Sequence, residues 1–281
     1  MIKEEVLNSI IDNAIREDVG DGDHSSQACI PDTAMGKAHL LVKEEGILAG
    51  VDIAQRVFKK FDSNINIVVF IKDGAEVKPG DIVFIVEGKV LDLLKAERLV
   101  LNIMQRMSGI ATRTSVYVKK LDGLKTRVLD TRKTTPGLRE IEKLAVKIGG
   151  GVNHRIGLYD MVMLKDNHID FAGGIEKAVH SVQEYLKANN KDLKIEVEVR
   201  DFKELDEVLK VGGIHRIMLD NFTHEETRKA VKIIDGRFET ESSGGITLET
   251  LRGYAECGVD YISVGALTHH IKSLDLSLKA I

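Results

Sequence analysis

Charged and polar side chains follow a series of short apolar segments in the second half of the sequence. The segments cover residues 127–131, 160–165, 194–199, 215–220, 237–242 and 259–264. Five of them end in Asp130-Thr131-Arg132-Lys133, Lys165-Asp166-Asn167-His168, Asp220-Asn221, Glu241-Ser242-Ser243-Gly244-Gly245 and Ser263-Val264-Gly265-Ala266, while the third carries Glu196 and Glu198. In barrels of parallel strands the chemistry gathers at the carboxyl ends of the strands. A series of such ends predicts one shared site.

The charges around the first two segments indicate an anionic ligand. Residues 127–168 hold eight Lys and Arg against five Asp and Glu, in a chain whose net charge is −4. Arg132 and Lys133 precede Thr135-Pro136, a pair that predicts the start of a helix whose exposed amides reinforce anion binding. The late turns Ser243-Gly244-Gly245 and Ser263-Val264-Gly265 let backbone N–H groups approach an oxyanion, and the last two strands are the usual phosphate site of such barrels.

Two carboxylates face this cationic region. Glu198 and Asp220 belong to neighbouring segments and suit either an oxygen-liganded Mg²⁺ or the hydroxyls of a sugar. Arginine binds carboxylates with a planar fork that bonds both oxygens at once. The residues therefore predict a phosphorylated sugar beside a ligand with further carboxylates or phosphates.

Amphipathic helices are predicted between most of these segments, at 137–148, 173–188, 202–211, 224–234 and 247–257. Alternating strands and helices are typical of βα units and a parallel sheet. No GxGxxG motif follows the first strand, which disfavours a doubly wound nucleotide-binding sheet. We therefore expect a six-stranded, incomplete parallel α/β barrel over residues 111–266.

The first 110 residues follow a different pattern and predict an α+β domain. Helices are expected at 3–16, 51–61 and 92–107, strands at 36–45, 65–71 and 77–88, and a loop at 18–26. His24, Asp21 and Asp23 of that loop could suggest a metal site, but a Gly- and Asp-rich turn is commoner. Residues 267–281 are expected to pack back on this sandwich-like domain.

Composition excludes several classes of protein. The net charge of −4 argues against a nucleic-acid binder held by bulk charge. Apolar stretches of about five or six residues are too short to span a membrane, and the acidic MIKEEV start is unlike a secretion signal. Cys29 and Cys257 are too few and too far apart for a disulfide framework or a metal knuckle, so we expect a reducing, cytoplasmic setting.

Several strings, in order, resemble the quinolinate phosphoribosyltransferase family, the carboxylating nicotinate-nucleotide pyrophosphorylases. They are KAERLVLNIMQRMSGIATRT (95–114), DTRKTTPGLRE (130–140), GGGVNHRIGLYDMVMLKDNH (149–168), EVEV (196–199), MLDN (218–221), ESSGGI (241–246) and DYISVGALTH (260–269). The long strings are specific, and the short ones count through their order. Arg200 and His270 stand where the family often has an acid and a serine.

The resemblance implies a role for each matched residue. Arg98 would reach quinolinate in the barrel of a second subunit, within a homodimer or a hexamer. Five cations would bind quinolinate's carboxylates and the phosphates of the ribose donor: Arg132, Lys133, His154, Arg155 and Lys165. Glu198 and Asp220 would hold the ribose hydroxyls and Mg²⁺ and, with Lys133, act in catalysis. The turns at 243–245 and 263–265 would cradle the 5-phosphate.

The implied reaction converts quinolinate and phosphoribosyl pyrophosphate into nicotinate mononucleotide, pyrophosphate and CO₂, in NAD biosynthesis. Mg²⁺ and positioned charges would supply the catalysis, with no organic cofactor.

Other functions are compatible with parts of the pattern. A paralogue associated with molybdate transport has similar strings and would act on another anionic heterocycle. Lys165 could instead form a Schiff base, as in an aldolase-like barrel. A sugar-phosphate sensor would bind without turnover. Taken alone, Arg98 is a solvated charge, Glu196 an exposed ion pair, and His154 and His168 residues that cap strands.

Overall fold

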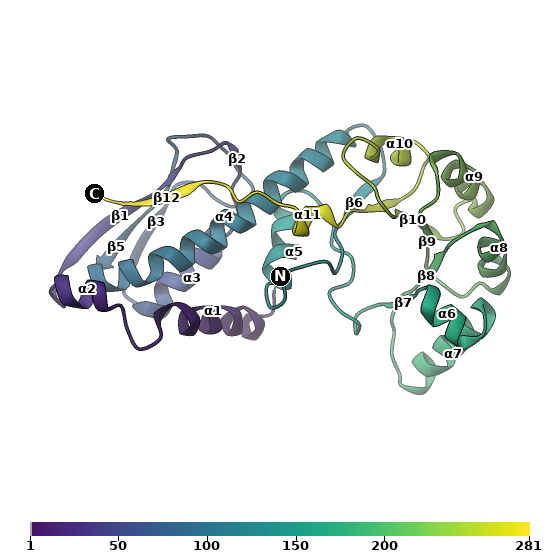
Figure 1. The fold of residues 1–281 in the computed structure, drawn as a ribbon, viewed down its shortest axis with the longest axis horizontal. Helices are drawn as coiled ribbons and strands as arrows, with labels where there is room; N and C mark the ends of the chain where they lie inside the picture. Colours follow the sequence, from purple (N-terminus) through teal and green to yellow (C-terminus); the bar gives the residue numbers. More distant parts are fainter. Residues whose placement is uncertain (1) are drawn as a thin grey trace. The chain divides into compact units, whose positions relative to one another are not determined.

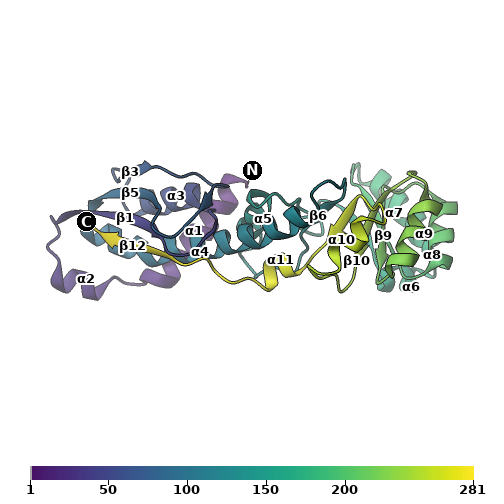
Figure 2. The same ribbon diagram turned by 90° about the horizontal axis from the view of Figure 1, so that it is seen from above.

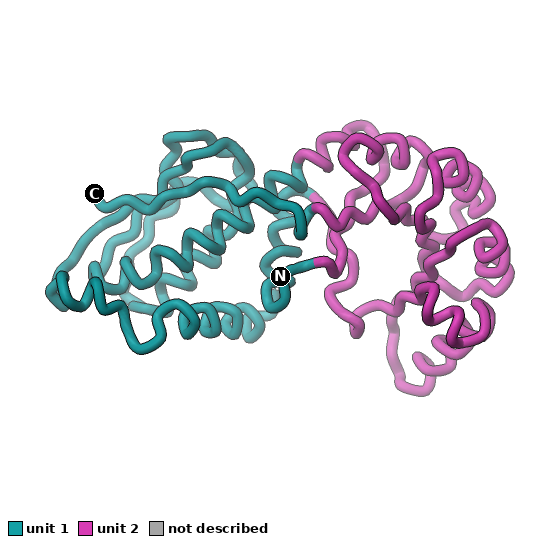
Figure 3. Tube along the Cα trace, viewed as in Figure 1, with its two compact units in different colours: residues 1–115, 134–150, 267–281 teal, residues 116–133, 151–266 magenta. Residues whose placement is uncertain are grey.

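The structure is a computed structural model that describes residues 2–281, and the chain divides into two compact units (Figure 3). Unit 1 contains the chain up to Ser115, Thr134–Gly150 and Leu267–Ile281. Unit 2 contains Val116–Lys133 and Gly151–Ala266. Each unit therefore combines segments that lie far apart in the sequence. No helix within residues 2–281 has both the length and the apolar character needed to cross a membrane.

Unit 1 is built on a four-stranded antiparallel sheet with the order β12-β1-β5-β3. Its strands are β1 (Met35–Val42), β3 (Asn66–Val69), β5 (Ile82–Lys89) and β12 (Leu276–Ala280), and a small pair adds β2 (Gly46–Ile47) and β4 (Glu76–Val77). The last strand, β12, pairs with β1, so the C-terminal segment belongs to this sheet (Figure 1).

The helices of unit 1 bury apolar faces on its core. They are α1 (Glu4–Val19), α2 (His24–Cys29), α3 (Val51–Phe61), α5 (Arg139–Ile148) and most of α4 (Val90–Lys120). Phe58 of α3 meets Phe84 of β5 edge to face, with ring centroids 6.0 Å apart. Both rings are fully buried, as are Leu40 and Val42 of β1.

Two predictions in this region are wrong. The expected loop at 18–26 contains the start of α2, because the Asp23 carboxylate caps that helix and accepts the Ser26 N–H at 3.1 Å. The helix expected to end at residue 107 continues as α4 to Lys120. Within it, Gly109 allows the Lys272 backbone to approach: a Cβ there would lie 2.3 Å from the Lys272 carbonyl oxygen.

Unit 2 contains a six-stranded sheet with the order β6-β11-β10-β9-β8-β7, in which every neighbouring pair is parallel. The strands are β6 (Arg127–Leu129), β7 (Val162–Leu164), β8 (Ile195–Val199), β9 (Arg216–Asp220), β10 (Glu239–Ser243) and β11 (Tyr261–Ser263). Within residues 2–281, β6 and β7 are the two edges and do not pair with each other. The curved sheet with its outer helices (Figures 1 and 2) confirms the predicted incomplete α/β barrel.

The helices of the barrel follow the strands. They are α6 (Asp166–Ala172), α7 (Ile175–Ala188), α8 (Phe202–Val211), α9 (His224–Ile234) and α10 (Leu251–Ala255), with the short α11 (Ala266–His269) after β11. The ranges of α8 and α9 match the prediction, and each begins at a capping residue, Asp201 and Thr223. Gly173 and Gly174, with φ values of 83° and 122°, separate α6 from α7.

The predicted helix start at Thr135-Pro136 is wrong. Helix α5 begins at Arg139 behind Leu138, which makes no side-chain cap. The preceding residues form a turn in which the Leu138 N–H donates to the Thr135 carbonyl oxygen at 3.1 Å. The anion-binding helix N-terminus expected beside Arg132 and Lys133 is therefore absent from this described segment.

The two faces of the barrel sheet differ in chemistry. On one face, Val197, Val199, Ile217 and Leu219 join an apolar cluster with residues of α7, α8 and α9. Residues alternate between faces along a strand, so their neighbours in sequence lie on the other face. That face carries Glu196 and Glu198 of β8, Arg216 and Asp220 of β9, Glu239 and Glu241 of β10, and Ser263 of β11. The inner face of the barrel thus carries these charged and polar residues together with Met163 and Met218, which pair in register with Glu196 and Glu198.

Candidate active site

His154 lies in a segment that extends the edge of the barrel. Val152 pairs with Leu129 of β6, and the following backbone is held by Asp130, which is fully buried. The Asp130 carboxylate accepts the His154 N–H at 2.8 Å and the Asn153 side-chain amide at 2.5 Å. The Asp130 side chain, which the sequence placed at a strand end, therefore anchors this segment.

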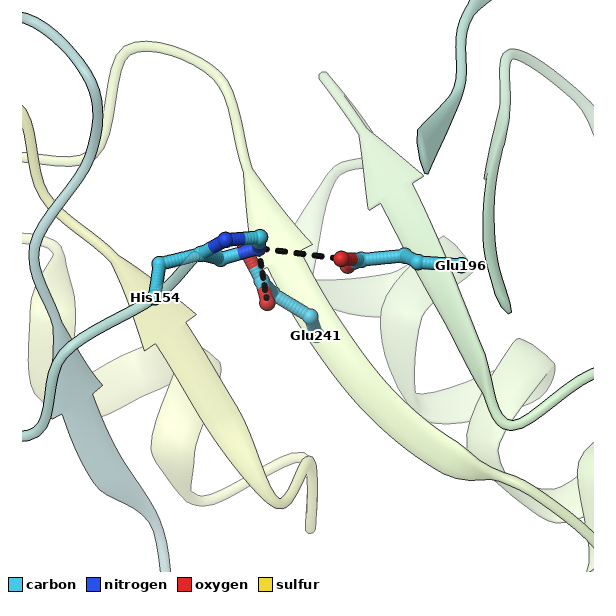
Figure 4. A group of neighbouring side chains, drawn as sticks. All are labelled: His154, Glu196 and Glu241. Carbon is cyan, nitrogen blue, oxygen red and sulfur yellow. Dashed lines mark ion pairs between the residues drawn. The ribbon is translucent and has the colours of Figure 1, made fainter. Parts of the chain in front are cut away.

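The imidazole of His154 points into the barrel between two buried glutamates (Figure 4). Its Nε2 lies 2.9 Å from Oε2 of Glu196 and 3.5 Å from Oε2 of Glu241. Burial lowers the pKa of His154, but the two carboxylates outweigh it and raise the pKa to about 9. Burial and the repulsion of Glu241 raise the pKa of Glu196 to about 7, against the opposing effects of His154 and Arg216.

Arg216 completes this buried group. Its Nη1 donates to Oε2 of Glu241 at 2.9 Å, and its Nε and Nη2 donate to Oε2 of Glu239 at 3.1 and 3.0 Å. The guanidinium also lies 4.2 Å from the ring centroid of Tyr261. Burial alone raises the pKa of Glu241, but His154, Arg216 and a hydrogen bond from Ser263 lower it below its ordinary value.

Three members of this group were given no role by the sequence analysis, or the wrong one. Glu196, for which an exposed ion pair was one interpretation, is fully buried: β8 is an interior strand, and Glu196 faces the barrel while Ile195 and Val197 face the helices. Arg216 and Glu241 were not assigned a function. The available signal was the alternation of charged and apolar residues in EVEV, RIMLD and ETESS, which predicts one polar face.

Lys165 and Glu198 form an ion pair at the carboxyl ends of β7 and β8. Nζ of Lys165 lies 2.6 Å from Oε2 of Glu198, whose side chain is 9% exposed. The next helix, α6, begins here, and the Lys165 N–H donates to Nδ1 of His168 at 3.0 Å. His168 therefore caps the start of helix α6, whereas the sequence allowed it as a residue that caps a strand. An ammonium held by a carboxylate is a poor Schiff-base nucleophile, which disfavours the aldolase-like alternative.

Arg155 and Arg132 lie near each other at the same rim. Nη1 of Arg155 donates to the Met161 carbonyl oxygen at 3.1 Å, which orients the guanidinium. Burial and the neighbouring Arg132 lower the pKa of Arg155, as expected for two cations in proximity. Arg132 and Lys133 are exposed, and the Lys133 N–H donates to Oγ1 of Thr131 at 3.0 Å.

The turn after β10 packs closely against the end of β9. The Asn221 N–H donates to the Ser243 carbonyl oxygen at 2.9 Å, and the Asn221 side chain donates to Asp220 at 2.7 Å. A Cβ on Gly244 would lie 2.2 Å from Oδ1 of Asn221, and Gly244 has a φ of 93°, so only glycine fits. In the turn after β11, the Val264 N–H donates to the Leu129 carbonyl oxygen at 2.9 Å and so extends the pairing of β11 with β6.

The structure places most of the predicted site residues at one end or on one face of a single sheet. Glu198 pairs in register with Met218, two residues before Asp220, so the two carboxylates lie on the same face of adjacent strands. Ser243 and Ser263 are the last residues of the adjacent strands β10 and β11, and Lys165 directly follows β7 at the other edge of the sheet. Arg98 belongs to unit 1 and is exposed on α4.

Two family models match the chain. The family model of the quinolinate phosphoribosyl transferase C-terminal domain matches residues 110–279, and that of the N-terminal domain matches residues 23–108.

Similar proteins with these names match nearly the whole chain. Quinolinate phosphoribosyltransferase [decarboxylating] 1b of Nicotiana tabacum is 46% identical over 97% of this chain and 82% of that protein. The probable nicotinate-nucleotide pyrophosphorylase [carboxylating] of Bacillus subtilis is 42% identical over 97% of this chain and 92% of its own length. The crystal structure of NadC from Streptococcus pyogenes has a TM-score of 0.93 at 39% identity, covering 100% of this chain and 99% of that one.

Proposed function

Since the chain belongs to the quinolinate phosphoribosyltransferase family, we propose that the rim and polar inner face of its barrel bind both substrates. The reaction is the transfer of a phosphoribosyl group from phosphoribosyl pyrophosphate to quinolinate with decarboxylation, a step of NAD biosynthesis. Nicotinate mononucleotide, pyrophosphate and CO₂ are the products. Each side chain of the site has its own role in binding or catalysis.

The cations bind the acidic substrates. Arg155 and Arg132 lie close enough to repel each other, which a dicarboxylate placed between them would relieve. Lys165, His154 and Lys133 add positive charge around them, while the turns at 243–245 and 263–265 hold the 5-phosphate. Backbone N–H groups of the glycines in these turns can approach an oxyanion closely.

The bond changes need positioning more than acid–base chemistry. The pyridine nitrogen of quinolinate attacks the anomeric carbon, the C–O bond to pyrophosphate breaks, and pyrophosphate leaves with the electron pair. Glu198 and Asp220 stabilise the positive charge that develops on the ribose, and Lys133 offsets the negative charge of the leaving group. The ring nitrogen is then cationic, so the adjacent C–CO₂⁻ bond can break with its electron pair left on the ring carbon. A proton from water completes the product.

Magnesium fits the same two carboxylates. Glu198 and Asp220 lie on one face of adjacent strands and offer the oxygen donors that Mg²⁺ prefers. When bound with the pyrophosphoryl group, Mg²⁺ would neutralise charge on the leaving group. No step requires an organic cofactor.

Arg98 is assigned to the active site of a second subunit. It is exposed on α4 within one of the two longest strings that resemble the family, and its guanidinium would meet quinolinate in the partner's barrel, in a homodimer or a hexamer. The cysteines Cys29 and Cys257 are both free thiols, which supports a reducing compartment such as the cytoplasm.

The observation that carries these roles is the Lys165–Glu198 ion pair beside Asp220, with Arg155 at the same end of the sheet. The direct test incubates the protein with quinolinate, phosphoribosyl pyrophosphate and Mg²⁺ and follows CO₂ and nicotinate mononucleotide. Nicotinate replaces quinolinate as the control substrate, and a second series omits Mg²⁺. Turnover of quinolinate that depends on Mg²⁺ supports the proposal; turnover of nicotinate at the same rate, or none of either, contradicts it.

A further inference from the structure

Four charged side chains form a continuous group across the inside of the barrel. They are His154, Glu196 of β8, Arg216 of β9 and Glu241 of β10, and none is more than 9% exposed. Glu241 is shared: its Oε2 lies 3.5 Å from Nε2 of His154 and 2.9 Å from Nη1 of Arg216. Two carboxylates therefore face an imidazole and a guanidinium, and all four side chains are buried.

Burying such a group of charges lowers the stability of the fold unless every charge has a partner. The interior of an α/β barrel is ordinarily filled with branched apolar residues, which would pack at lower cost. Val197 and Ile217, the neighbours of these residues in sequence, show that apolar residues are present on the same strands, on the opposite face. The charged group must therefore serve something other than packing.

The position of His154 indicates what that is. Leu129 of β6 pairs with Ser263 of β11 on one side and with Val152 on the other, so the segment that carries His154 lies along the free edge of β6. Within residues 2–281 this edge has no strand pairing to β7. The bonds of His154 to Glu196 and Glu241 consequently connect the open edge of the barrel to strands inside the sheet (Figure 4).

The other side of the same imidazole reaches Arg155. The Arg155 N–H donates to Nδ1 of His154 at 2.7 Å, while Nε2 faces the two glutamates. His154 therefore connects the buried carboxylates of Glu196 and Glu241 to the backbone of Arg155, the residue assigned to bind quinolinate. We propose that Glu196 and Glu241 are positioning residues, which hold His154 and, through it, set the Arg155 backbone so that its guanidinium faces the carboxylates of quinolinate.

This inference rests on the role of Arg155 in the proposed function. It also differs from a metal site, although ligand atoms of His154, Glu196 and Glu241 lie within 4.8 Å of one another. Arg216 already supplies a positive charge at 2.9 Å from Glu241, and Nδ1 of His154 is engaged by Arg155. A divalent ion would lie beside the Arg216 guanidinium, whose positive charge repels it.

The experiment compares Glu196→Ala and Glu196→Gln with Arg155→Ala in steady-state assays that vary quinolinate and phosphoribosyl pyrophosphate separately. We expect Glu196→Ala to raise KM for quinolinate about tenfold or more and to change KM for phosphoribosyl pyrophosphate less than about twofold. Glu196→Gln should recover most of the loss, because an amide oxygen still accepts from Nε2–H. Glu239→Gln is the matched control, since Glu239 contacts Arg216 without contacting His154.

Each outcome decides between distinct explanations. If Arg155→Ala keeps wild-type KM for quinolinate, the proposed function of Arg155 fails. If Arg155→Ala loses quinolinate binding while Glu196→Ala does not, the inference alone is overturned. Equal increases in both KM values, with no recovery in Glu196→Gln, would indicate a merely structural role. A stoichiometric metal ion in the wild type that Glu241→Gln loses would also overturn it. Should Glu196→Ala fail to fold, Glu196→Asp, which withdraws the carboxylate by one methylene, is expected to show the same selective effect.

Discussion

The outer and inner faces of the six-stranded sheet are made by the same strands but perform different tasks. On β8, Val197 packs among the helices while Glu196 and Glu198, on either side of it, face the interior. On β9, Ile217 and Leu219 alternate in the same way with Arg216 and Asp220. The apolar face stabilises the fold, and the charged face provides the chemistry. A substitution on one face should therefore affect stability or activity with little effect on the other property.

The largest expected effect is on the inner face, where Lys165→Ala and Arg132→Ala should each lower kcat/KM by about 10²- to 10³-fold. Both cations face anionic substrates, and loss of Lys165 also leaves Glu198 without its ion pair. The measurement is the rate of nicotinate mononucleotide formation beside a thermal melt of each variant. Both variants should melt within a few degrees of the wild type. Near-normal turnover in either would remove its assigned role.

On the outer face, Ile217→Ala should destabilise the protein by roughly 3 kcal/mol while folded molecules keep their activity. Ile217 is fully buried between the sheet and its helices, so the substitution leaves a cavity. Urea unfolding measures the loss, and Ile233→Ala on α9, where the isoleucine is 41% exposed, is the matched control with little change expected. Loss of kcat at temperatures where Ile217→Ala remains folded would show that the two faces are not separable.

The smallest effect concerns the helix layer beyond the outer face. Asp201 caps α8 by accepting the Glu204 N–H at 2.9 Å, and Asp201→Ala should cost about 1 kcal/mol. Asp201→Asn preserves the acceptor and should restore most of the stability. Neither variant should change kcat. A change in kcat would show that the helix layer influences the active site on the inner face of the sheet.

Much of this organisation could be predicted from the sequence because it depends on short-range patterns. The ranges of α8 and α9 follow from the 3.6-residue period and from the capping residues Asp201 and Thr223. The strand ends that carry Lys165, Asp220 and Ser243 were located by the same means. One error lies where a long-range contact is made, since α4 continues past residue 107 where Gly109 meets the Lys272 backbone. The other is local, since a turn over Thr135–Leu138 delays the start of α5 to three residues after Pro136.

The sequence by itself determined which residues alternate, which are charged and which segments become strands, because these depend on side-chain chemistry within a few positions. It also placed the chain among its relatives through strings that need no coordinates to compare. Only the tertiary structure decided the pairing of charges: Lys165 with Glu198, His154 with Glu196, and Arg216 with Glu241. These partners are separated by 25 or more residues along the chain. The curvature and register of the parallel strands, which the whole sheet sets together, bring their charged ends within hydrogen-bond distance.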